Sequence, residues 1–287
     1  VVEKLVKGHN HMGKHVGKEL PDAIGLSSKT HRNTDLDIED RIKGVKGGDR
    51  RDGGGLDGLK PSSGPVRRFP TSLANAVARA RELAKSLANR RCKTDPVDVA
   101  SGEMVMSQTD LALPGVLPLV LRRTHISGYE YGHCYGVSWA STFDERLEPT
   151  GSGAMWARED GSVLVYPMLP AEEGQEVLPL EGDRLPLTLA GRSELGDVTY
   201  AVTDDRALLI RRFTGSPYRA GGLYWLGEIE DGNGNAVRVQ RNADGLPTAV
   251  HHDGGYHVRV ETNLDIGRIT GLELRTPQGA IRVASFG

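Results

Sequence analysis

Residues 93–111 have the sequence KTDPVDVASGEMVMSQTDL, and this stretch separates two kinds of polypeptide. Of the fifteen Phe, Trp and Tyr residues, only Phe69 precedes the stretch, and the next one is Tyr129. The part before the stretch is polar, basic and rich in glycine. The part after it consists of short β-type runs separated by Gly, Asp, Asn and Pro. The stretch therefore marks the boundary between a leading segment and a β-rich region.

The formal charge changes at the same boundary. Residues 1–93 contain 20 Lys and Arg against 11 Asp and Glu, a net charge of +9, whereas residues 94–287 contain 16 against 27, a net charge of -11. A basic segment can contact nucleic acid or an anionic surface. Polar segments of this composition are more often solvated linkers, so we expect no specific nucleic-acid partner.

Two further features limit the class of protein. The cysteines, Cys92 and Cys134, do not make a disulfide framework, and we expect free or buried thiols. No stretch has the apolar core of a signal peptide or the length of a transmembrane helix. The sequence begins with Val1 and stops at Gly287 inside a strand-like pattern, so we expect both ends to be cuts through a longer protein.

The distribution of glycine, proline and apolar residues divides the chain into five parts. We expect a polar, weakly helical segment (1–46), a Gly/Pro-rich linker (47–70), an amphipathic helix (71–92), an opening β domain (93–170) and β-hairpin repeats (171–287). The helix should start at Thr71 or Ser72 and present one narrow apolar stripe, formed by Leu73, Val77, Ala80, Ala84 and Leu87.

The β-type region contains several strand and turn signals. The run Leu117–Thr124 includes a proline near its start, which favours a position near a sheet edge. The run Gly136–Leu147 alternates like one strand, with Trp139, Ser141 and Phe143 on one face. Asp160-Gly161 between two apolar runs is typical of a hairpin.

The last sixty residues repeat a strand, turn and strand pattern. Asn242 and Asn263 begin equivalent turns and are 21 residues apart. One hairpin is only marginally stable in water, so tandem hairpins must stack into a longer sheet. The predicted fold class is therefore mainly β, with antiparallel hairpin repeats forming a curved sheet.

Five segments together resemble the opening of Rhs-type, YD-repeat polymorphic toxins: Asp95–Glu103, Asp110–Val116, Leu121–Thr124, Tyr135–Trp139 and Asp160–Tyr166. Residues 231–272 are similar to degenerate repeats of the same family. There Asp265-Ile-Gly-Arg-Ile269 resembles the Asp-x-x-Gly-Arg-Leu turn, with one residue fewer before the glycine and Leu264 in place of the usual tyrosine.

The resemblance implies a β-sheet ribbon that forms a shell around a toxic C-terminal domain, which this chain does not include. It implies a secreted or cell-envelope protein, exported without a recognisable cleaved signal peptide, whose N-terminal segment could contact a secretion-system adaptor. The residues that carry the family motif are interpreted as structural: Asp95, Pro96, Val97, Gly102, Glu103, Pro114, Gly115, Arg122 and Trp139. The chain itself is then a non-enzymatic part of the shell.

Several His, Cys and Trp residues could in principle take part in catalysis or binding, but we interpret each of them as structural. His9-Asn10-His11 with His15 lacks the context of a nuclease, His251 and His252 fall on opposite faces of a strand, and Cys134 with His125 or His133 lacks an assignable third group. We predict no catalytic, metal or cofactor site, and we expect Trp139, Trp156 and Trp225 to pack in the core. A carbohydrate-binding surface module, a His-rich nuclease or thiol peptidase, and processing near Asp95–Glu103 remain alternatives.

Overall fold

The computed structural model describes residues 69, 72–85, 97, 102–215 and 222–286. Several sequence predictions lie outside these residues: those for 1–46, for 47–70 apart from Phe69, and for Cys92, Asp95 and Pro96. The His9-Asn10-His11 string belongs to this group as well.

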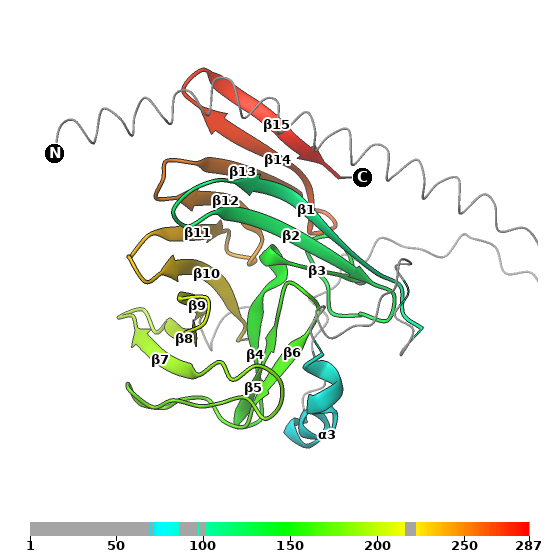
Figure 1. The fold of residues 1–287 in the computed structure, drawn as a ribbon, viewed down its shortest axis with the longest axis vertical. Helices are drawn as coiled ribbons and strands as arrows, with labels where there is room; N and C mark the ends of the chain where they lie inside the picture. The colour runs from blue at the N-terminus through cyan, green and yellow to red at the C-terminus, as the bar shows by residue number, and fades with distance from the viewer. Residues whose placement is uncertain (1–68, 70–71, 86–96, 98–101, 216–221, 287) are drawn as a thin grey trace, which may run out of the picture.

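The described residues form one α-helix, one 3₁₀ turn and fifteen strands (Figure 1). The helix is α3 (Leu73–Leu83) and the 3₁₀ turn is η3 (Thr142–Asp144). The strands are β1 (Val105–Leu113), β2 (Leu119–Ile126), β3 (Trp139–Ser141), β4 (Arg146–Thr150), β5 (Gly153–Ala157), β6 (Val163–Tyr166), β7 (Leu187–Arg192), β8 (Val198–Asp204), β9 (Leu209–Gly215), β10 (Tyr224–Asp231), β11 (Ala236–Arg241), β12 (Pro247–His252), β13 (His257–Asn263), β14 (Arg268–Thr276) and β15 (Gly279–Ser285).

These strands make two sheets, and every pair of named strands is antiparallel. The small sheet has the order β1-β2-β3. The large sheet runs β15-β14-β13-β12-β11-β10-β4-β5-β6, and β9, β8 and β7 continue it from β10. The predicted fold class, mainly β with antiparallel hairpins, is confirmed, and the sheet is open.

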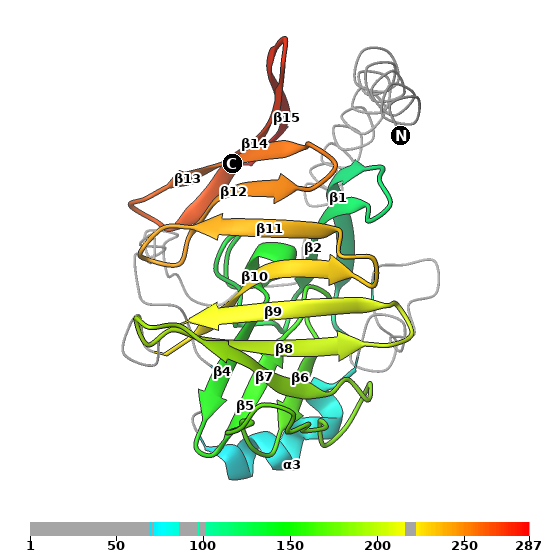
Figure 2. The ribbon, with the colours of Figure 1, turned by 90° about the vertical axis from the view of Figure 1, so that its left-hand side faces the viewer.

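Strand β10 is the branch point of the large sheet. Along one side it pairs with β9. On the other side, Tyr224 and Trp225 pair with β4, whereas Glu228, Ile229 and Glu230 pair with β11. Two series of strands therefore diverge from β10, and Figure 2 shows β4–β6 behind β7–β9 while β11–β15 continue upward.

The repeated turns have a common local cause. The side-chain oxygen of Asn242 accepts hydrogen bonds from the backbone of Asp244 and Leu246, and the oxygen of Asn263 accepts one from Asp265. This Asx geometry imitates a backbone turn. Gly245 and Gly267 then adopt positive φ angles of 83° and 65°, which glycine tolerates without steric cost.

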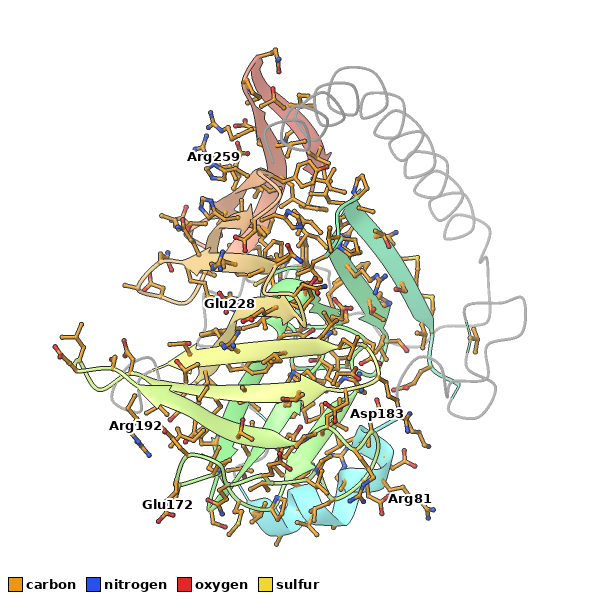
Figure 3. All side chains as sticks on the ribbon, turned by 60° about the vertical axis from the view of Figure 1, so that its left-hand side comes forward. Arg81, Glu172, Asp183, Arg192, Glu228 and Arg259 are labelled. Atoms are coloured by element: carbon orange, nitrogen blue, oxygen red, sulfur yellow. The ribbon has the colours of Figure 1, made fainter. Side chains whose placement is uncertain are left out.

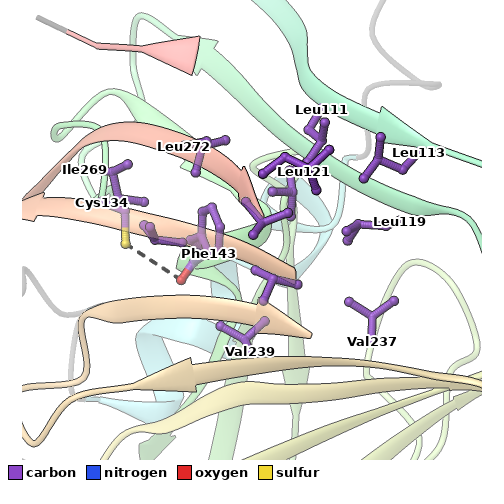
Figure 4. Packing of buried hydrophobic residues seen from close by; sticks show 14 of the residues in the cluster. Leu111, Leu113, Leu119, Leu121, Cys134, Phe143, Val237, Val239, Ile269 and Leu272 are labelled. Atoms are coloured by element: carbon purple, nitrogen blue, oxygen red, sulfur yellow. Dashed lines mark hydrogen bonds between the residues drawn. The ribbon is translucent and has the colours of Figure 1, made fainter. Parts of the chain in front are cut away.

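The small sheet covers the inner face of β11–β14. Their buried side chains form one core with β1 and β2, shown in Figure 4: Leu111, Leu113, Leu119 and Leu121 from the small sheet, and Val237, Val239, Val250, Val258, Val260, Ile269, Leu272 and Leu274 from the large sheet. Alternation along each strand places these residues on one face. Burial of a Leu or Val side chain stabilises a fold by about 1.5–3 kcal/mol.

Strands β4–β6 are covered on both faces. On one face Leu147, Trp156 and Leu164 pack against residues of β7–β9. On the other face Met155 and Val163 pack against Ala76 and Ala80 of α3 and against other residues of the same cluster. All residues of β5 and β6 are buried, which explains why these short strands are almost continuously apolar.

The outer face of the large sheet is charged. In Figure 3, Glu228 and Arg259 project from the face opposite β1–β3. Arg238 bridges Glu228 and Asp253, and Arg282 pairs with Glu261. The large sheet is thus apolar toward the small sheet and polar on its outer face.

Two strand predictions were wrong in detail. Strand β2 was expected near an edge, but it lies between β1 and β3, and Pro118 falls just before the strand, where no ladder hydrogen bond is needed. The run Gly136–Leu147 is two strands, because η3 interrupts it after Ser141. Trp139 and Phe143 therefore do not share one strand face.

The helix prediction was partly wrong. Ser72 occupies the N-cap position, although its side chain makes no capping hydrogen bond. Ala76, Ala80 and Ala84 are the buried positions, while Val77 is 46% exposed. Small alanines on the covered face allow the helix to approach β5 and β6 closely. No helix among the described residues is long and apolar enough to span a membrane.

Candidate functional site

The connection from the small sheet to the large sheet contains a cluster of charged residues inside the protein. Asp144, Glu145, Arg146 and Glu148 are 2%, 2%, 0% and 4% exposed, and we refer to them as the buried charge network. Asp144 ends η3, Glu145 follows it as the C-cap, and Arg146 and Glu148 lie in β4. Buried charges are costly unless they are paired and hydrogen-bonded, so each one needs a partner.

Asp144 fixes the turn between the two sheets. Its Oδ2 accepts a hydrogen bond from Ser141 Oγ at 2.6 Å, and Ser141 Oγ accepts one from the Asp144 backbone at 3.2 Å. Its Oδ1 accepts hydrogen bonds from the backbone N–H groups of Cys134, at 2.8 Å, and His133, at 3.1 Å. One carboxylate therefore joins η3 to the loop that precedes β3.

Arg146 joins β4 to two other segments. Its guanidinium donates to Glu148 Oε1 at 2.8 Å, to the Asp144 carbonyl at 3.0 Å and to the Tyr131 carbonyl at 3.0 Å. The rings of Phe69 and Trp225 lie 5.7 and 5.6 Å from its Cζ atom. Such fully satisfied geometry stabilises a buried guanidinium, and loss of one partner costs about 3–5 kcal/mol.

Glu148 extends the network toward the helix. Its Oε2 accepts a hydrogen bond from the Phe69 backbone at 3.0 Å, and Phe69 packs beside Tyr131 with ring centroids 4.0 Å apart. The residue that precedes α3 is therefore attached to β4 by a charge-assisted hydrogen bond.

Glu145 faces the opposite side of the strand. Its Oε2 accepts a hydrogen bond from Trp156 Nε1 at 3.1 Å, and Arg211 Nε lies 3.7 Å away. Burial raises the pKa of Glu145 to about 7, although the nearby Arg211 acts in the opposite direction. This carboxyl group is the member of the network that can change protonation near neutral pH.

Cys134 lies beside the network but does not have the environment of a nucleophile. It is 0% exposed, and its Sγ is 3.8 Å from the Phe143 carbonyl. Burial raises the pKa of the thiol, so the reactive thiolate is disfavoured. Asp144 binds the backbone N–H groups of His133 and Cys134, which is not the base-orienting contact that a thiol peptidase requires.

The histidines of the repeats lie on two faces, as predicted. His251 stacks on His257 of the next strand, with ring centroids 4.3 Å apart. His252 is buried, and its Nε2 donates to the Leu117 carbonyl. Among the described residues, no group of three or more His, Cys, Asp or Glu side chains could hold a metal ion.

The described residues of the family motif, from Val97 to Trp139, lie before, within and between the strands of the small sheet. Val97 forms an isolated bridge with Met104. Gly102 has a φ of 73°. Glu103 lies so close to Gly128 that a Cβ atom there would come within 2.2 Å of Glu103 Oε1. The structure therefore does not bring these residues together at one site.

Pro114 and Gly115 lie in the β1–β2 loop, which packs on the large sheet. A Cβ atom on Gly115 would come within 2.9 Å of the Leu117 carbonyl and 3.1 Å of the His252 ring. The backbone N–H of Arg122 donates a hydrogen bond to Thr142 Oγ1 at 3.0 Å. Trp139 is half-buried, with the Arg123 guanidinium 4.7 Å from its ring. Trp156 and Trp225 are buried in the core, as predicted.

Sequence reasoning did not identify the buried charge network. The signal was present, because the segment 144–148 contains four charged residues inside a strand-like run. Alternation alone would place Arg146 and Glu148 on a solvent-exposed face. The coverage of β4 on both faces, which buries them, depends on residues far away in the sequence.

Known proteins resemble part of this chain. Residues 94–166 match a family described as a domain of unknown function, DUF6531. The chain is 26% identical over 232 residues to double-stranded DNA deaminase toxin A of Burkholderia cenocepacia, covering 75% of this chain and 16% of that protein. It is 38% identical over 77 residues to the probable deoxyribonuclease RhsB of Dickeya dadantii, covering 27% and 5%.

The chain thus spans less than a fifth of the length of either relative. The matched family segment begins one residue into the boundary stretch at residue 93 and ends with β6. It therefore comprises the small sheet, the buried charge network and the covered strands β4–β6. These matches confirm the predicted resemblance of this chain to Rhs-type polymorphic toxins.

Proposed function

We propose that this chain is a non-enzymatic encapsulation segment, the first part of a curved β-shell that encloses the C-terminal toxin domain of a longer, exported protein. One relative is named as a toxin, and this name is the reason for proposing a toxin domain as the enclosed part. In this proposal residues 1–93 contact a secretion-system adaptor. The motif residues that lie in the small sheet and its loops, such as Gly115 and Trp139, serve to close and position that sheet.

The observation that supports the proposal is the difference between the two ends of the large sheet. At the β6 end, α3 packs on the sheet and Leu180 donates to the Val165 carbonyl at 2.9 Å. At the other end, β15 is hydrogen-bonded to β14 alone among the described strands. A paired and covered end beside an open edge favours sheet growth in one direction.

The interior supports a structural role. Asp144 and Arg146 belong to the buried charge network, and both hydrogen-bond to backbone groups of other segments: Asp144 to the Cys134 N–H and Arg146 to the Tyr131 carbonyl. The carbohydrate-binding alternative loses two of its three candidate stacking surfaces, because Trp156 and Trp225 are buried.

The longer protein gives the direct test. We expect its toxin domain to resist protease while the shell is folded, and to be digested once urea opens the shell. A toxin domain digested as fast in the native protein as in urea would contradict encapsulation. The 287-residue chain alone should neither cleave nor deaminate DNA, and either activity in the purified chain would contradict a non-enzymatic role.

A further inference from the structure

A cleft of about 640 Å³ opens between the small sheet and the branch point of the large sheet. This volume is within the range of sites that hold small molecules. One wall comes from β2 and the loop before it, and the other from β9, β10 and β11.

The lining of the cleft is largely apolar. It includes core residues of both sheets, Leu119 and Leu121 of β2 and Val237 and Val239 of β11, which are at most 9% exposed and which Figure 4 shows on facing sides of the interface. The mouth is apolar as well, since Val116 and Leu208 are 79% and 68% exposed. An aliphatic group would therefore gain burial along the cleft.

The rim on the small-sheet side is fixed in place. The Leu117 carbonyl accepts a hydrogen bond from His252, and the close approach of Gly115 to the same ring leaves no room for a side chain. The cleft is thus preformed, which lowers the entropic cost of binding.

Arg211 supplies a cation at the polar end of the cleft. Its Nε is buried and has no hydrogen-bond partner among the described residues, the carboxylate of Glu145 lies 3.7 Å away, and the Trp156 ring lies 5.8 Å from Cζ. The side chain is 19% exposed, so a ligand would meet the exposed part of the guanidinium and not Nε. Glu145 Oε2 already accepts a hydrogen bond from Trp156. A second carboxylate would give Arg211 the hydrogen bonds that guanidinium groups make best.

The other charged residues that line the cleft are engaged with their neighbours. Glu159 accepts hydrogen bonds from Thr142 at 2.6 Å and Arg122 at 3.4 Å. Asp231 accepts hydrogen bonds from Asn233 and Asn235 in its own turn. Among the charged residues of the lining, Arg211 therefore has the longest contact with an opposite charge, at 3.7 Å from Glu145.

The backbone of the large-sheet wall argues against a peptide ligand. Strand β9 is paired with β8 and β10, and Ile229 of β10 is paired with both β9 and β11. The main-chain groups of that wall are used within the sheet. A peptide buried against it would leave its own N–H and C=O groups without partners there.

We propose that this cleft binds an aliphatic carboxylate, with the carboxylate at Arg211 and the alkyl chain between β2 and β9–β11. The site is independent of the encapsulation proposal, because it requires only the fold of this chain. The small sheet and the branch point of the large sheet together create the pocket.

Isothermal titration of the full 287-residue chain with decanoate tests the proposal. We expect saturable binding of decanoate and at least tenfold weaker binding of decyltrimethylammonium, which has the same alkyl chain and the opposite charge. Equal binding of the two amphiphiles, or no binding of decanoate, would overturn it. Tighter binding of the acidic peptide acetyl-Leu-Val-Glu-amide than of decanoate would also overturn it, in favour of a peptide site.

Arg211→Met should weaken decanoate binding about tenfold or more, because a charge-assisted hydrogen bond is lost while the side-chain length is kept. Arg212→Met is the matched control, since this neighbour pairs with Glu228 on the other side of the strand and should leave binding unchanged. Thermal unfolding of both variants establishes that they fold. Equal affinity in Arg211→Met and the original chain would overturn the assignment.

A second pair of variants applies even if Arg211→Met fails to fold. Leu208→Asp places a like charge at the exposed mouth, at a position whose φ of 53° suits Asp better than Leu. It should weaken decanoate binding several-fold. Leu195→Asp, at an 86% exposed position that does not line the cleft, should not. Equal affinity of these two variants would overturn the proposal.

Discussion

The two ends of the large sheet differ in how they are stabilised. At the covered end, β5 and β6 are buried throughout, between α3 and β7–β9. At the open end, no residue of β15 is buried. The covered end is held by packing and internal charges. The open end is held by its ladder with β14, by the exposed ion pair of Arg282, and by Val283, Ala284 and Phe286, which are only partly buried against the core. The edge of β6 is thus covered within the chain, whereas β15 pairs with β14 alone among the described strands.

The largest expected effect comes from the buried charge network. Arg146→Met keeps the bulk of the side chain but leaves Glu148 buried without its cation, so the free energy of unfolding should fall by about 3–5 kcal/mol. Arg282→Met, at an exposed ion pair of the open end, should cost less than about 1 kcal/mol. Urea unfolding of both variants measures the difference.

The double variant Arg146→Met with Glu148→Gln sharpens the same comparison. The neutral amide retains an oxygen for the Phe69 backbone, so part of the lost stability should return. An Arg146→Met variant as stable as Arg282→Met would show that the network does not hold the covered end together.

Core packing should give the next largest effect. Leu164 of β6 is 0% exposed, and Leu164→Ala should cost about 2–5 kcal/mol through lost burial and the cavity left behind. Ile281 of β15 is half-buried, so Ile281→Ala should cost about 1 kcal/mol. Equal losses in thermal or urea unfolding would mean that the two ends are stabilised alike.

A smaller effect should appear as a pH dependence. The folded-state pKa of Glu145, about 7, lies above the unfolded value of 4.5, so between these values the folded chain holds a proton that the unfolded chain has lost. Stability from this group is full below pH 4.5 and falls as the pH rises through 7, by about 3 kcal/mol.

Glu145→Gln should remove that component while keeping an oxygen for Trp156. Urea midpoints of the variant and the original chain, compared at pH 5 and pH 7.5, measure the difference. Glu172→Gln, at an exposed position, serves as the control and should follow the original chain. The prediction fails if Glu145→Gln and the original chain have parallel pH profiles.

The repeated hairpins could be predicted from the sequence because their causes are local. Asn242 and Asn263 form Asx turns, and Gly245 and Gly267 supply positive φ angles, so the pattern is visible within a few residues. The covered end could not be predicted in the same way. In the sequence, Arg146 cannot be distinguished from an ordinary exposed strand residue. Its burial depends on Tyr131, Phe69 and Glu148, which the fold brings around it.

The break at η3 was missed for a related reason. Residues 136–147 alternate like one strand, and the turn is fixed by Asp144, whose partners include the distant backbone of His133 and Cys134. The cleft likewise depends on the meeting of β2 with β9–β11, which no local motif encodes. Local turn chemistry therefore predicted the hairpins, while the site depended on contacts between sheets.

Amide hydrogen exchange tests the central claim most directly, measured on the 287-residue chain and on the longer protein that the encapsulation proposal implies. We predict that β5 and β6 are protected in both, and that β15 exchanges rapidly in the isolated chain but at least about a hundredfold more slowly in the longer protein, where a further strand pairs with its edge. Equal exchange of β15 in both proteins would contradict the account of a sheet that begins at a covered end and grows from β15.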